Sequence, residues 1–196
     1  KIYSYRKEAV EGVLEHFNEF KSYCFMSATP IAMDFKPDAL KDVEEYIADW
    51  KHIEPLTILP YKTNRAYMLT ANLIKAYQRE GYIKKDELKS YEAYFFINSV
   101  TEIKKILEYT HLTNDDCRII CADEDKNRRT LGEYQISSST DAPKKFNFIT
   151  SKSFEGVDFY SETGICYVVS NIHNEHTLLS VDMDIPQIAG RIRNTN

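Results

Sequence analysis

No run of apolar residues in this 196-residue sequence approaches the roughly 20 that a membrane-spanning helix requires. The opening stretch 1–7 is rich in polar and charged residues, where a signal peptide would have an apolar segment. We therefore expect a soluble, cytoplasmic protein without a membrane partner. The sequence also lacks internal repeats and low-complexity tracts. With 43% hydrophobic and 13% aromatic residues, it has the content to bury a sizeable globular core.

Excess positive charge is absent as well. The net charge of −5 excludes a protein that binds nucleic acid through bulk positive charge, as a histone-like protein does. Any contact with nucleic acid therefore has to be local. We expect the polar stretch 123–145 to be a loop with a short hairpin or insertion. It holds a group of basic residues that either line the path of a nucleic acid or form a solvated face. This group consists of Lys126, Arg128, Arg129, Lys144 and Lys145.

A metal-ligand pattern is missing too. His173 and His176 are three residues apart, but no cysteine or third ligand lies near them in the sequence. The cysteines sit in apolar runs, where a reduced thiol behaves as a small hydrophobic group. We therefore expect no metal site. We expect buried thiols at Cys24, Cys117, Cys121 and Cys166.

From residue 56 onward, short apolar runs alternate with amphipathic helical patterns. Such alternation is typical of parallel strands covered by helices. The sequence therefore predicts an α/β fold with an open parallel sheet and helices on both faces. The expected strands are 56–59, 93–97, 118–122, 146–150 and 165–170, and the expected helices are 64–80, 100–109 and 185–192.

The beginning of the chain has a different pattern. Apolar residues at helical spacing predict a helix within 4–21, and the apolar run 23–26 predicts a buried strand that Pro30 closes. The following stretch is mixed in pattern and contains Trp50, as a connector often does. We therefore expect three parts: 1–30, a connector 31–55 and a domain 56–196.

Four short segments carry a family pattern. They are Ser27–Thr29, Tyr94–Ser99, Thr150 with Glu155–Phe159, and Gln187–Arg193. In this order and spacing they resemble motifs III, IV, V and VI of superfamily 2 DEAD/DEAH-type helicases. The resemblance covers essentially the whole chain. It implies a RecA-like fold in which residues 1–30 end a first RecA-like domain and residues 56–196 form the second.

The last segment resembles motif VI, which in this family brings positive charge to the phosphates of ATP. The resemblance implies that Arg191 is the arginine finger, with Gln187 and Gly190 near the nucleotide; the alternative is an arginine paired with a surface carboxylate. In the commoner pattern a second arginine stands where this chain has Asn194, whereas here it is Arg193. This compressed ending is similar to that of viral origin-binding helicases and their bacterial and phage relatives. The individual roles of Arg191 and Arg193 stay open.

The motif V segment implies contacts with both ligands. By the resemblance, Thr150 hydrogen-bonds a nucleic-acid phosphate and Asp158 meets the ATP ribose. Gly156 lets the backbone approach closely or take a positive φ. The alternative roles are a threonine that ends a strand and an aspartate that caps a turn.

The motif IV segment places Asn98 and Ser99 at the carboxyl end of a buried strand, where ligands dock on open α/β sheets. The resemblance implies contacts with nucleic acid, and Ser99 serves equally as a helix N-cap. Motif III, formed by Ser27, Ala28 and Thr29, implies coupling between the two motor domains, although a polar stop after a strand accounts for these residues as well.

Two motifs that this family needs are missing: the Gly-x-x-x-x-Gly-Lys-Ser/Thr loop and the Asp-Glu-x-His/Asp box. Because the chain starts with Lys1 and ends at Asn196 directly after a charged motif, we expect a piece of a longer protein that does not hydrolyse ATP by itself. Its first RecA-like domain would bind ATP and Mg²⁺, and the nucleic acid would be single-stranded DNA rather than RNA. The alternatives are a duplex translocase that does not separate strands and a non-catalytic RecA-like module that binds nucleic acid or protein.

Overall fold

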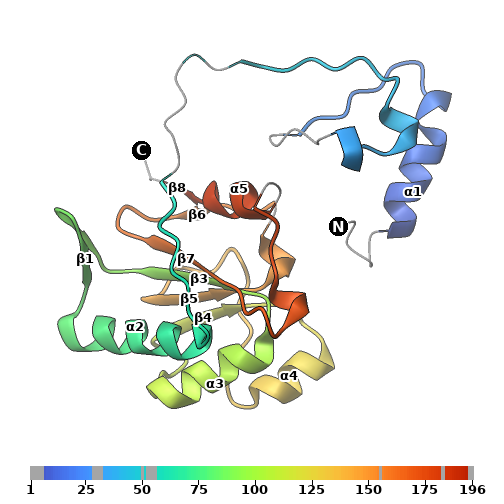
Figure 1. The fold of residues 1–196 in the computed structure, drawn as a ribbon. Coiled ribbons are helices and arrows are strands. Elements are labelled where there is room, and N and C mark those ends of the chain that lie inside the picture. Colours follow the sequence, from blue (N-terminus) through green and yellow to red (C-terminus); the bar gives the residue numbers. More distant parts are fainter. Residues whose placement is uncertain are drawn as a thin grey trace. The chain divides into compact units, whose positions relative to one another are not determined.

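The computed structural model describes residues 7–27, 33–49, 51, 57–154, 156–181 and 184–193. The chain divides into two compact units, residues 1–55 and 56–196 (Figure 1). The division falls where the stretch expected to be a connector ends. The assignment of residues 1–30 to a first motor domain stays a prediction.

In its described residues, the N-terminal unit consists of one α-helix and three short 3-10 helices. These are α1 (Lys7–His16), η2 (Phe17–Glu19), η3 (Met33–Phe35) and η4 (Asp38–Leu40). Helix α1 has no buried residue. The apolar centre of this unit is the ring of Phe17, which is 4% exposed and meets the rings of Tyr23 and Phe25 edge-on, with centroids 4.7 and 5.2 Å away.

The strand expected at 23–26 is not formed. This segment is irregular chain, and Tyr23, Phe25 and Met26 are exposed. The prediction was wrong because an apolar run becomes a strand only beside a second strand, and the described part of this unit contains no strand. Cys24 is exposed for the same reason, which corrects the expectation of a buried thiol. The other three cysteines are buried or partly buried in the C-terminal unit, and burial raises the pKa of the Cys121 thiol to about 11.

A four-stranded parallel sheet is the centre of the C-terminal unit. Its strands are β3 (Ala93–Ile97), β4 (Cys117–Ile120), β5 (Phe146–Ile149) and β7 (Ile165–Val169), in the spatial order β4-β5-β3-β7. All residues of β3, β4 and β5 are buried. The apolar runs of the sequence are continuous here because both faces of the sheet are covered.

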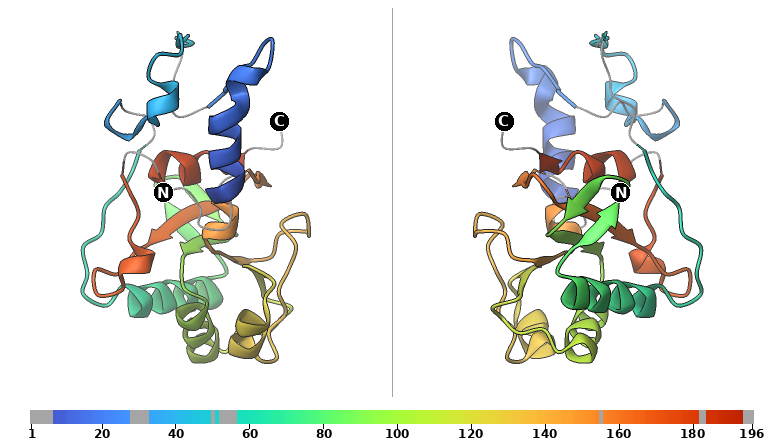
Figure 2. Two further views of the ribbon diagram at one scale, coloured as in Figure 1. Left: turned by 90° about the vertical axis from the view of Figure 1, so that its right-hand side faces the viewer. Right: turned by 90° about the vertical axis from the view of Figure 1, so that its left-hand side faces the viewer.

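Three helices cover one face of this sheet. They are α2 (Ala66–Glu80), α3 (Val100–Thr110) and α4 (Asp125–Leu131), and they form a single layer in Figures 1 and 2. Helix α3 begins at the N-cap Ser99 and buries Ile103, Ile106 and Leu107, which share one face at helical spacing. Helix α2 ends at Gly81, whose φ of +81° suits a glycine C-cap.

The opposite face has a thinner cover. Phe96 and Ile149 pack there against Phe154, Phe159 and Ile188. These three residues come from the turn after β5, from the short strand β6 (Phe159–Tyr160) and from the six-residue helix α5 (Asp184–Ala189). Strand β6 pairs in parallel with β8 (Ile192–Arg193). The unit is therefore a mixed α/β fold with a parallel sheet flanked by helices, while the RecA-like assignment stays a prediction.

Three expectations for this unit were wrong, and one hairpin was not predicted. The helix expected at 185–192 ends at Ala189, and Ile192 belongs to strand β8, which pairs with β6. Residues 57–59 do not form a strand, and Ile58 and Leu59 are exposed, because no neighbouring strand pairs with them among the described residues; residue 56 lies outside the described part. The polar stretch 123–145 contains helix α4, anchored by the fully buried Leu131. A hairpin of β1 (Ile83–Lys85) and β2 (Leu88–Ser90) was missed because its strands are rich in lysine. Elsewhere, no described helix has the length and apolar character to cross a bilayer.

We predict that Gly164→Ala lowers the free energy of unfolding by about 1–3 kcal/mol, the cost of overpacking a filled site. A Cβ at this position would lie 2.7 Å from Cε2 of the fully buried Tyr94 and 2.9 Å from Oγ of Ser161. Urea denaturation measures the loss. Gly190→Ala is the control, because its methyl group would meet its nearest atom, the Pro186 oxygen, at 3.8 Å. Equal stability of the two variants would contradict the packing described here.

Candidate functional site

Two segments far apart in the sequence lie side by side at the β6–β8 pair. The Phe159 N–H donates to the Arg191 carbonyl at 2.7 Å, and the Ser161 N–H donates to the Arg193 carbonyl at 2.9 Å. This pairing brings Asp158, immediately before β6, to the two arginines. The segments expected to be motifs V and VI therefore form one local site.

Arg191 is held by several acceptors. Its Nε donates to the Gln187 carbonyl at 2.9 Å, and its Nη2 donates to the Gln187 side-chain oxygen at 3.1 Å. Its Nη1 reaches the Val157 carbonyl at 3.4 Å and Oδ1 of Asp158 at 3.5 Å. The Arg191 side chain is 16% exposed, so the guanidinium is fixed in place within the unit.

Arg193 has a different environment. Its Nε lies 3.1 Å from the same oxygen, Oδ1 of Asp158, and its side chain is 56% exposed. One carboxylate thus serves two guanidinium groups, so the three side chains carry a surplus of one positive charge. An exposed arginine with surplus positive charge beside it suits an anionic ligand.

The two glycines expected at this site have different requirements. Gly156 has a φ of +72°, a conformation that side-chain-bearing residues rarely adopt, so a glycine is required there. Gly190 does not have a positive φ, and a Cβ would have room. Its N–H donates to the Pro186 carbonyl at the end of α5.

Thr150 lies at the carboxyl end of β5, as expected, but its hydroxyl faces the protein. The residue is 6% exposed, and its Oγ1 donates to the Ile120 carbonyl at 3.3 Å. The next residues, Ser151 and Lys152, are more exposed. Lys152 places its Nζ 3.3 Å from the Cys121 carbonyl. The structure therefore gives Thr150 an internal partner and leaves the contact surface of this turn to its neighbours.

Asn98 and Ser99 follow β3 at the same edge of the sheet. The Asn98 side chain accepts from the Ser151 N–H at 3.2 Å and donates to the His176 carbonyl at 2.7 Å. It therefore ties the turn after β5 to the loop after β7. Ser99 is buried, and its hydroxyl accepts from the Glu102 N–H as the N-cap of α3. No local pattern in the sequence indicates the Asn98 contacts, because His176 is 78 residues away.

The other predicted residues belong to other parts of the chain. Ser27 belongs to the N-terminal unit and is exposed, and Ala28 and Thr29 lie outside the described residues. The basic group of 123–145 splits between two places. Arg128 on α4 pairs with Asp123 at 2.6 Å, whereas Lys144 and Lys145 precede β5 at the amino ends of the strands and donate to the Asn114 and Tyr77 carbonyls. His173 and His176 are exposed, and no cluster of metal-ligating side chains occurs in the described part of the chain.

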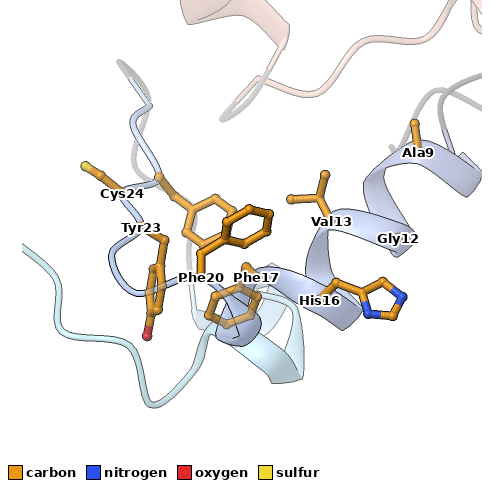
Figure 3. A pocket seen from close by; sticks show the side chains of 9 residues that line it. Ala9, Gly12, Val13, His16, Phe17, Phe20, Tyr23 and Cys24 are labelled. Atoms are coloured by element: carbon orange, nitrogen blue, oxygen red, sulfur yellow. The ribbon is translucent and has the colours of Figure 1, made fainter.

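A hollow of about 580 Å³ lies in the N-terminal unit. Figure 3 shows the rings of Phe17, Phe20 and Tyr23 along it, with Val13 of α1 on another side. Its lining is mostly apolar, and the side chains in it that carry a polar group are His16, Tyr23 and Cys24.

Comparison of the chain with family models, with curated proteins and with solved structures gave no match.

We predict that Thr150→Val lowers the free energy of unfolding by about 0.5–1.5 kcal/mol, because it removes the hydroxyl that donates to Ile120. Valine keeps the shape of the side chain, so the loss reports the hydrogen bond. Thr101→Val, at an exposed position of α3, is the matched control and should change stability by less than about 0.5 kcal/mol. An unchanged stability for Thr150→Val in chemical denaturation would show that the hydroxyl has no structural role.

Proposed function

We propose that this chain is the C-terminal motor domain of an ATP-dependent nucleic-acid helicase of superfamily 2. One observation carries the proposal: the segments that resemble motifs V and VI, 33 residues apart at Asp158 and Arg191, are hydrogen-bonded side by side. A site assembled from these two segments is what a nucleotide-facing surface of such a domain requires. The parallel sheet flanked by helices supports the same proposal.

The chemistry follows from the charge of the transferred group. Phosphoryl transfer is catalysed mainly by positioning and by neutralising negative charge. When bound between two domains, ATP with Mg²⁺ supplies the phosphoryl group and its leaving group. This chain would contribute an arginine of the Arg191–Arg193 pair, with Gln187 fixing Arg191. Gly156, Asp158 and Gly190 would border the nucleotide, whereas the phosphate-binding loop and the Mg²⁺ ligands would belong to the first RecA-like domain.

The nucleic acid would lie at the carboxyl ends of the strands. Asn98 and Ser99 follow β3 there, and Thr150 follows β5, where its more exposed neighbours Ser151 and Lys152 would make the contact. Backbone N–H groups and small polar side chains at such turns fix the register of a phosphate backbone without reading its sequence. We propose single-stranded DNA rather than RNA, on the similarity of the last segment to viral origin-binding helicases. Ser27, Ala28 and Thr29 would couple the two domains.

ATP hydrolysis tests this function. We would measure it for the 196-residue chain and for the longest reading frame that contains it, each with and without single-stranded DNA or RNA. We expect activity in the longer form alone, stimulation by single-stranded DNA, and a loss of about 10³-fold or more when the arginine that reaches the phosphate is replaced by alanine.

The negative outcomes are distinct. A longer form that is inert, with or without nucleic acid, would remove the motor function and favour a non-catalytic binding module. A longer form that hydrolyses ATP on duplex DNA but does not separate strands in an unwinding assay would be a translocase.

A further inference from the structure

The two arginines of the site are not equivalent in their surroundings. Arg191 gives hydrogen bonds to both oxygens of Gln187 and to the Val157 carbonyl, and it is 16% exposed. Moving its guanidinium toward a ligand would break all of these bonds at once. Hydrogen bonds from a charged donor are stronger than those between neutral groups, so Arg191 is held in place more firmly than Arg193.

Arg193 can move at little cost. Its side chain is 56% exposed, and within the described residues its one ion pair is to Asp158. An ion pair at this level of exposure contributes about 0.2–1 kcal/mol. A phosphate group, with more charge than a carboxylate and more acceptor oxygens, therefore displaces Asp158 from Arg193 easily.

Asp158 still contacts Arg191 when Arg193 moves to a ligand. Its Oδ1 lies 3.5 Å from Nη1 of Arg191, which the other acceptors hold still. The carboxylate thus has one fixed partner and one exchangeable partner. When Arg193 turns to a ligand, Asp158 no longer neutralises its positive charge.

We propose that Arg193, rather than Arg191, is the arginine that reaches the phosphates of the nucleotide, and that Asp158 takes the place of those phosphates in the free domain. Arg191 is then a positioning residue that keeps Asp158 at the β6–β8 pair. This assignment rests on the proposed function for the identity of its ligand. It departs from the sequence expectation that Arg191 is the finger.

The first test uses the 196-residue chain and inorganic tripolyphosphate. Side-chain NMR of the arginine Nε–Hε groups follows each guanidinium during the titration. We expect the Arg193 signal to shift and the Arg191 signal to stay. Asp158→Asn should tighten the apparent affinity for tripolyphosphate about 1.4- to five-fold, because a competing ion pair worth about 0.2–1 kcal/mol is gone. Arg191→Gln should weaken it, because Asp158 would then neutralise Arg193 fully.

The outcomes separate this assignment from the function on which it rests. A shift of the Arg191 signal instead of Arg193, an absence of any arginine shift, or an unchanged affinity in Asp158→Asn would each overturn the exchange.

A second test uses the longer reading frame. We expect Arg193→Ala to lower the kcat of ATP hydrolysis by about 10³-fold without changing the melting temperature. Arg191→Ala should lower both the kcat and the melting temperature. Loss of activity only in Arg191→Ala would restore Arg191 as the finger. A longer form without any ATP hydrolysis would refute the motor function and with it the nucleotide as ligand, while the tripolyphosphate titration would still decide which arginine binds anions.

Discussion

Strand β3 has to be covered on both of its faces, and the rest of the C-terminal unit is arranged around that requirement. All five of its residues are buried, and it pairs with β5 on one side and β7 on the other. Its residues alternate between the two core clusters, with Phe95 packed beneath the helices and Phe96 packed against the segments of the site. Because β3 is close-packed on both faces, the strands, helices and turns that contact it have few alternative positions.

This constraint also positions the site. The thin cover of the second face is built from the same segments that carry the polar residues, so core and site residues alternate along the chain. Asp158 precedes the buried Phe159, and Gln187 precedes the buried Ile188. Packing of the buried neighbour therefore positions the backbone of each polar residue. The β6–β8 hydrogen bonds then set the register between Asp158 and the arginines.

The sequence predicted those parts of the unit that have a local signal. The strands at 93–97, 146–149 and 165–169 and the helix that follows Ser99 come from apolar runs and from an N-cap, which are local signals. The same apolar signal misled at 23–26 and 57–59, because strand formation depends on a partner that a sequence window does not contain. Strand β1 and helix α4 were missed because they form without an apolar run: β1 is rich in lysine and α4 is mostly polar. Within the site, residue types came from the motifs, but the sharing of Asp158 by two arginines and the inward-facing hydroxyl of Thr150 depend on long-range pairing.

The strand order has a consequence for how the unit is made. Strand β4 follows β3 in the chain, yet β5 stands between them in the sheet. A nascent chain that has emerged only as far as residue 120 therefore holds two apolar strands that cannot pair with each other in their native positions. Their edges stay open until residues 146–149 are synthesised and insert between them. During that interval the chain exposes unpaired apolar strand edges, the kind of surface through which partly folded chains aggregate.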